Sequence, residues 1–128
     1  GKSTTLAILG GEYFTDAPLS NVDDKDSALQ LRGRWIMEMP ELSVLSKATT
    51  ESMLAFVSRT ADRYRSPYDR STRSYPRRCV FAGTTNKSLY LTRTSGNRRY
   101  WPVKVADRIK LDDLASIRDQ LWAEAVTL

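Results

Sequence analysis

The chain has 128 residues, of which 41% are hydrophobic and 27% charged, with a formal net charge of +5. These proportions are ordinary for one globular domain large enough to bury a core, and no apolar run approaches the roughly 18 residues that cross a membrane. With no histidine and a single cysteine, Cys79, the sequence excludes a disulfide framework, a Cys/His metal site and a His-based triad, and we expect a cytoplasmic protein.

The first half of the chain predicts helices alternating with loops and one strand. Residues 3–9 are expected to form a helix that ends at a glycine pair, and residues 12–23 are expected to be a loop. A short helix over 24–31 begins with acidic residues, which favour a helix N-terminus. Residues 34–39 are typical of a buried strand, and residues 47–59 of an amphipathic helix.

The second half predicts a hairpin, two strands and a long helix. Residues 62–77 contain two prolines and a polar centre, which favour a hairpin over a helix. Strands are expected over 78–83 and 100–105, and apolar residues keep helical spacing from Leu111 to the end. Cys79 is expected to be a buried strand residue without chemistry. Together these elements predict an α/β domain.

The first four residues match the end of a P-loop, whose full pattern is G-x-x-x-x-G-K-[ST]. In such a loop Gly1 and Thr4 would flank Lys2, which reaches phosphates, and Ser3, whose hydroxyl binds Mg²⁺. The pattern starts here at its last glycine, so we expect a core truncated within the Walker A motif that binds nucleotide poorly. An ordinary helix start is the alternative.

Two further segments place polar groups where strands end. Glu38 closes an apolar strand in the manner of a Walker B motif, and Glu41 follows just after a proline, so either could hold Mg²⁺ or orient water. Asn86 ends the next strand, at the edge where α/β folds bind ligands. A surface turn is the alternative for both segments.

Arginines are concentrated in two places. Residues 59–78 contain seven arginines and two aspartates, a net +5 that equals the formal charge of the whole chain. Such a segment favours phosphate or nucleic acid as a partner, with a solvated face as the alternative. Further along, Arg98 and Arg99 are suited to an arginine finger that reaches a neighbouring subunit, or to a basic turn.

In order, the segments GKST, WIMEMPEL, DRYRSPYDRSTRSYPRR, CVFAGTTN and SGNRRYWPV form a series that resembles the virulence-associated protein E family of phages and mobile elements. The series is also similar to superfamily 3 helicase-type ATPases, including poxvirus-type primase-helicases. The resemblance implies that residues 1–128 are a partial P-loop NTPase domain of the AAA+ type. It also implies a homo-oligomeric ring that uses ATP and Mg²⁺ on DNA during replication.

Residue by residue, the resemblance assigns Lys2 and Ser3 to Walker A, Glu38 or Glu41 to Walker B, and Asn86 to sensor 1. It assigns Arg98 or Arg99 to the arginine finger. Between Walker B and sensor 1, such helicases have a hairpin that contacts the DNA backbone. The candidate contacts with DNA, expected to be single-stranded, are Arg65, Arg70 and Arg73.

Two functions are therefore possible. The first is an ATP-dependent DNA helicase or translocase in which hydrolysis at subunit interfaces moves the basic hairpin. The second is a non-catalytic, basic DNA-binding module derived from such an ATPase. Loss of hydrolysis in a Lys2 variant distinguishes the two.

Overall fold

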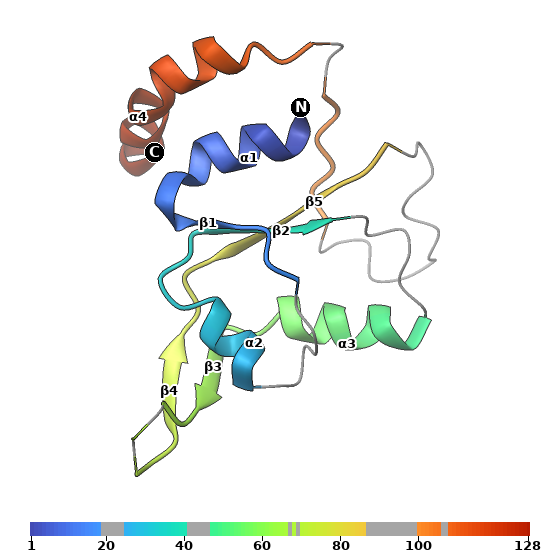
Figure 1. The fold of residues 1–128 in the computed structure, drawn as a ribbon, viewed down its shortest axis with the longest axis vertical. Coiled ribbons are helices and arrows are strands. Elements are labelled where there is room, and N and C mark those ends of the chain that lie inside the picture. Colours follow the sequence, from blue (N-terminus) through green and yellow to red (C-terminus); the bar gives the residue numbers. More distant parts are fainter. Residues whose placement is uncertain (19–24, 41–46, 67, 69, 87–99, 106–107) are drawn as a thin grey trace.

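The structure is a computed structural model that describes residues 1–18, 25–40, 47–66, 68, 70–86, 100–105 and 108–128. These residues form a mixed α/β fold, with a three-stranded parallel sheet, a separate two-stranded hairpin and helices on both sides of the sheet (Figure 1). Within the described segments, no helix combines the length and apolar character that a membrane span requires.

The sheet has the order β1-β2-β5, with β1 at Phe14–Thr15, β2 at Ile36–Pro40 and β5 at Val80–Thr84. Both pairings are parallel, and Ile36 is opposite Val80 while Pro40 is opposite Thr84. Parallel strands bring their carboxyl ends to one edge of the sheet. The residues that end β2 and β5 are therefore neighbours.

Two helices, α1 (Lys2–Gly10) and α4 (Leu111–Thr127), lie on one face of the sheet (Figure 1). A short 3₁₀ helix, Gly11–Tyr13, connects α1 to β1. The chain needs glycine at the end of α1, because a Cβ on Gly10 would lie 2.8 Å from the Cβ of Phe14. Gly11 follows with a φ of 53°, in the left-handed region that glycine adopts readily.

Helix α4 is joined to the end of α1 by two hydrogen bonds to one carbonyl. Arg118 Nε and Trp122 Nε1 donate to the oxygen of Leu9, at 3.1 and 2.9 Å. The last carbonyls of a helix have no partner within it, and a cation beside them is favourable. Trp122 also meets the ring of Trp35 edge-on, at 5.7 Å between centroids.

The opposite face of the sheet is covered by α2 (Lys25–Gln30) and α3 (Lys47–Val57) (Figure 1). The core lies here, with Met37 of β2 and Phe56 of α3 fully buried and Leu31 almost so. Phe81 of β5 meets Phe56 edge-on, at 5.7 Å between ring centroids. Because successive strand residues point to opposite faces, Ile36 contacts the α1 side while Met37 enters the core.

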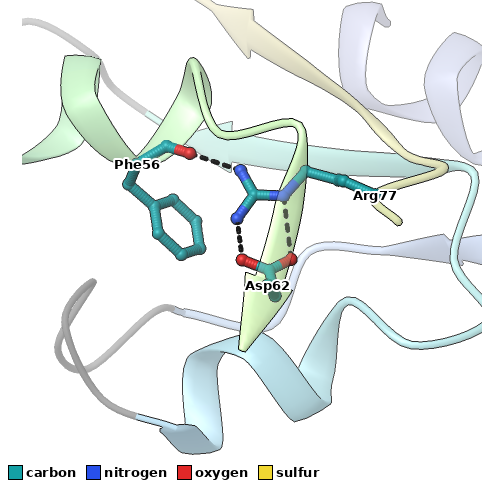
Figure 2. A network of polar contacts seen from close by, with 3 residues as sticks. All are labelled: Phe56, Asp62 and Arg77. Carbon is teal, nitrogen blue, oxygen red and sulfur yellow. Dashed lines mark hydrogen bonds and ion pairs between the residues drawn. The ribbon is translucent and has the colours of Figure 1, made fainter. Parts of the chain in front are cut away.

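The hairpin consists of β3 (Ala61–Tyr64) and β4 (Arg73–Pro76), paired antiparallel, and extends away from the sheet on the side of α2 and α3 (Figure 1). A buried ion pair fixes its base (Figure 2). Arg77 donates from Nε and Nη2 to the two carboxylate oxygens of Asp62 and from Nη1 to the carbonyl of Phe56. Helix α3, strand β3 and the segment leading into β5 are thereby joined at one point.

Most predicted elements are confirmed, with boundaries that shift by at most two residues, but two predictions are wrong. Residues 100–105 form no strand, and Trp101 is 90% exposed. Pro102 has no N–H to donate to a neighbouring strand, which disfavours pairing there. The expected loop 12–23 contains the end of the 3₁₀ helix and β1, a strand of two residues that is too short to show an alternating pattern.

Candidate functional site

Lys2, the second residue of the P-loop pattern, begins α1 and reaches across to the end of β5. Its Nζ donates to the backbone oxygen of Thr85 at 2.7 Å and to Oδ1 of Asn86 at 2.5 Å. These partners lie 83 and 84 residues away in the sequence. The contacts put a cation, an amide and the N-terminus of a helix at one edge of the sheet.

The carboxylate of Glu38 lies beside this group and is only 4% exposed. Its Oε1 accepts hydrogen bonds from Ser3 Oγ at 2.6 Å and from Thr84 Oγ1 at 2.9 Å. Both donors are neutral hydroxyls, and within the described residues neither a cation nor any other donor reaches the carboxylate. A buried carboxylate of this kind is suited to receiving a cation.

The donor set fits a magnesium–phosphate ligand. Mg²⁺ prefers oxygen ligands and usually takes one or two carboxylates together with substrate phosphates, which matches the Ser3 hydroxyl and the Glu38 carboxylate. Lys2 and the exposed start of α1 are suited to anionic oxygens. Among the described residues no three His, Cys, Asp or Glu side chains form a metal cluster, so a site supplied entirely by such ligands is not found there.

A family model described as the virulence-associated protein E-like domain matches residues 1–128. The chain belongs to this family. The search of curated proteins found no match. The match covers residues 1–128, so the resemblance to the virulence-associated protein E family is confirmed.

Other candidate residues of this virulence-associated protein E-like domain lie around or outside the group. Gly1 and Thr4 are exposed at the start of α1, where the amino group of Gly1 donates to Thr4 Oγ1 at 3.2 Å. Glu41, Arg98 and Arg99 lie outside the described residues. The choice between Glu38 and Glu41, and between Arg98 and Arg99, therefore stays a prediction.

The candidate DNA contacts are exposed and lie at different positions along the hairpin. Arg65 follows β3, Arg70 lies between the strands, and Arg73 belongs to β4, where it is opposite Tyr64. Arg77 is part of the basic segment, yet its side chain is only 4% exposed and it pairs with Asp62. One of the seven arginines is thus structural and not available to an anion at the surface.

Sequence patterns did not single out Thr84 as a site residue. Its role follows from the register, because Pro40 and Thr84 are opposite each other and Glu38 lies two residues earlier on the same face of β2. The signal that could have identified Thr84 is a hydroxyl-bearing residue at the end of one strand, beside a neighbouring strand that carries an acid.

Cys79 precedes β5 and is half-buried, so the prediction of a buried strand residue is wrong on both points. Burial raises the pKa of its thiol, and the nearby guanidinium of Arg77 opposes this only in part. A protonated thiol is a poorer nucleophile than a thiolate. The expectation that Cys79 takes no part in chemistry stays a prediction.

Proposed function

We propose that this domain is a P-loop ATPase of helicase or translocase type that serves the replication of a phage or mobile element. The proposal combines the family, the mixed α/β fold with a parallel sheet, and the chemistry of the group at the ends of β2 and β5. The substrate is ATP with Mg²⁺. The proposed protein moves along DNA, which it contacts through the sugar-phosphate backbone.

Four residues have roles in binding the nucleotide and in its hydrolysis. Lys2 neutralises the terminal phosphate, Ser3 and Glu38 hold the metal, and Asn86 senses the γ-phosphate or orients the attacking water. Glu38, or Glu41 after it, polarises that water. Bound Mg²⁺ supplies neutralisation of the charge that develops on the phosphate oxygens.

A second copy of the chain completes the site in this proposal. Arg98 or Arg99 of a neighbour in a homo-oligomeric ring stabilises the charge on the transferred phosphoryl group. Hydrolysis then changes the position of the basic hairpin, which holds the strand by its phosphates and does not read sequence.

One observation carries the proposal. Lys2, Glu38 and Asn86 are far apart in the sequence, yet Lys2 contacts Asn86 directly and the adjacent Ser3 contacts Glu38. A cation, an acid and an amide at the edge where parallel strands end are the parts that phosphoryl transfer requires. An ordinary helix start has no reason to gather them.

The decisive test is DNA-stimulated ATP hydrolysis by the protein as its gene encodes it. Lys2→Ala removes the phosphate contact and is expected to lower kcat at least about a hundredfold, because electrostatic stabilisation dominates such reactions. Lys104→Ala is the matched control, since it removes an exposed lysine outside the site. An inactive parent, or a Lys2 variant as active as the control, would favour a non-catalytic DNA-binding module instead.

The hairpin has its own test. Replacing Arg70 and Arg73 by alanine should weaken single-stranded DNA binding and reduce the salt dependence of log K by about 1.4, from roughly 0.7 for each of the two arginine–phosphate pairs removed. Lys104→Ala combined with Arg108→Ala removes two exposed charges elsewhere and serves as the control. An unchanged salt dependence in the hairpin variant would contradict the assignment.

A further inference from the structure

The hairpin carries a tyrosine whose position no fold requirement explains. Tyr68 lies between β3 and β4, and its side chain is fully exposed, at 106% of the reference value. Within the described residues it has no ring contact, ion pair or hydrogen bond. A large aromatic ring is thus held in solvent at the end of the hairpin that lies away from the sheet.

The other tyrosines of the hairpin behave differently. Tyr64 of β3 is 4% exposed, and its ring stacks on Tyr75 of β4 with centroids 4.5 Å apart. The hydroxyls of Ser66 and Tyr75 are 3.2 Å apart, within hydrogen-bond distance. Arg32 lies over the Tyr75 ring at 5.9 Å. These two rings stabilise the stem of the hairpin, so the stem does not need the ring of Tyr68.

The backbone at Tyr68 adds a second, independent observation. Its φ is 67°, and it is the only non-glycine residue with a positive φ among those described. A side chain with a Cβ is strained in this left-handed region, and a bulky one is a true outlier, whereas glycine and asparagine adopt it readily. Strain of this kind is concentrated at functional sites. Folding alone would favour a different residue here.

The charge around Tyr68 indicates which class of partner the ring contacts. Arg65, Arg70 and Arg73 are exposed on the same hairpin, and arginine is suited to phosphate. Proteins that bind single strands combine such a basic surface with aromatic rings on which bases stack, an interaction that accepts any base. A protein partner would require an apolar surface around the ring, but the described exposed residues near it in the sequence, 65 and 70–74, are arginine, serine and threonine.

We propose that Tyr68 stacks on a base of single-stranded nucleic acid whose phosphates contact the arginines of the hairpin. This inference deepens the proposed function and rests on its nucleic-acid part only, not on ATP hydrolysis. The ring supplies a grip on the unpaired bases, while the arginines supply the sequence-independent charge. Because bases in a duplex are already stacked on their neighbours, the contact favours an unpaired strand.

The test is a thermodynamic cycle between the ring and the bases, with the full chain and no nucleotide present. One probe is single-stranded oligothymidine, and the other is a strand of the same length built of abasic sites, with equal charge and no bases. Three proteins are compared by fluorescence anisotropy: wild type, Tyr68→Asn, which removes the ring but tolerates the backbone, and Tyr68→Phe, which keeps the ring. An oligouridine of equal length distinguishes RNA from DNA.

Wild type should bind oligothymidine about tenfold more tightly than the abasic strand, within the range of one stacked base. Tyr68→Asn should bind both strands alike, and Tyr68→Phe should retain the preference. The slope of log K against log salt on the abasic strand should be the same in all three, because every arginine of the hairpin is kept. The melting temperature of Tyr68→Asn should not fall, since the backbone strain is relieved.

A Tyr68→Asn protein that keeps the preference for bases would overturn the proposal. A protein partner would then be the better explanation of the exposed ring. Loss of the preference in Tyr68→Phe would overturn it as well, since the hydroxyl and not the ring would be responsible. If wild type binds both strands equally, stacking is refuted while the proposed ATPase stands. If wild type binds neither strand, the DNA-binding part of the proposed function fails together with this inference.

Discussion

Two buried carboxylates show how differently this chain uses an acid. Asp62 and Glu38 are 6% and 4% exposed, so water solvates neither well. Both oxygens of Asp62 accept from the guanidinium of Arg77 (Figure 2), whereas the hydrogen bonds to Glu38 come from two neutral hydroxyls and end on Oε1. Asp62 is compensated within the fold, and Glu38 lacks a cation among the described residues.

The difference separates structure from function. Arg77 also donates to the Phe56 carbonyl and lies over the rings of Phe56 and Phe81, at 4.5 and 5.4 Å from their centroids. Each of these partners belongs to the core or the hairpin base, so the pair is suited to holding the hairpin in place. Glu38 is at the edge where Lys2 and Asn86 meet, and a metal ion brought by a nucleotide would complete its environment.

Exchanging each acid for its amide tests this difference most directly. The larger loss of stability is expected for Asp62→Asn. Asp62→Asn leaves the charge of Arg77 buried without its counter-ion, which typically costs about 3–5 kcal/mol. Urea unfolding followed by circular dichroism measures the change. Asp113→Asn is the control, because that ion pair with Lys110 is largely exposed and contributes about 1 kcal/mol or less. Equal small effects in both variants would contradict a structural role for the buried pair.

The same exchange at Glu38 should affect activity and leave stability nearly unchanged. Glu38→Gln keeps the size and an oxygen that accepts from Ser3 and Thr84, but it removes the charge. If Glu38 holds Mg²⁺ or polarises water, kcat for ATP hydrolysis should fall at least about a hundredfold, or roughly 2.7 kcal/mol in the barrier. An active Glu38→Gln protein would transfer this role to Glu41.

A second readout at Glu38 does not depend on hydrolysis. Mg²⁺ with a non-hydrolysable ATP analogue should raise the melting temperature of wild type more than that of Glu38→Gln, because ligand binding stabilises the folded state. Asp62→Asn, although less stable at the outset, should show the same increase as wild type. A loss of the increase in Asp62→Asn would show that the two acids are not separable.

Part of this comparison could be predicted from the sequence, and part could not. The strand that carries Glu38 and the G-K-S-T segment have local signals, so the residue patterns alone single out Lys2, Glu38 and Asn86. The partner of Asp62 has no such signal, since Asp62 and Arg77 are 15 residues apart and belong to a segment whose arginines all look alike in composition. Burial depends on packing, which leaves the Arg73 residue exposed and the Arg77 side chain only 4% exposed, although the two lie four residues apart.

The same limit applies to the fold. Long periodic segments such as α3 and α4 are predicted well, because helical spacing over three turns is a strong signal. The strand expected over 100–105 is wrong, since its alternating apolar residues have no paired neighbour among the described strands. A strand forms only when a partner lies beside it, and the local sequence does not contain that information.

Thr84 offers a smaller test of how Glu38 is held. Thr84→Val keeps the shape of the side chain and removes the hydroxyl that donates to Oε1 at 2.9 Å. Loss of one hydrogen bond to a charged group costs about 1.5–3 kcal/mol when its partner stays buried. If Thr84 acts by positioning Glu38, kcat should fall about tenfold with KM nearly unchanged, within the range expected for one such hydrogen bond.

Thr84→Ser is the matched rescue, because it restores the hydroxyl. Its kcat should return towards that of wild type. If Thr84→Ser is as slow as Thr84→Val, the missing methyl group is responsible, and Thr84 acts through packing. If neither variant is slowed, Glu38 is held by Ser3 alone.

The thiol of Cys79 is a third acidic group, and its replacement is expected to have the smallest effect on stability. Burial raises the pKa of its thiol, Arg77 lowers it, and Asp62 raises it again. The folded thiol therefore ionises at a higher pH than the unfolded one. Its contribution to stability is complete below the unfolded pKa, about 8.5, and is lost as the pH rises through the folded pKa. In Cys79→Ala the part of this stability loss that comes from the thiol, which begins above its unfolded pKa, should be absent.

The pH midpoint of Cys79 alkylation reports the same balance directly and connects it to Asp62. Because the carboxylate of Asp62 offsets the attraction of Arg77 for the thiolate, Asp62→Asn should lower the midpoint relative to wild type. The midpoint, and not the rate, is the proper measure, since a destabilised protein opens more often and reacts faster at every pH. A midpoint that stays constant would mean that burial alone governs the thiol, and that the charges of Asp62 and Arg77 are felt only by each other.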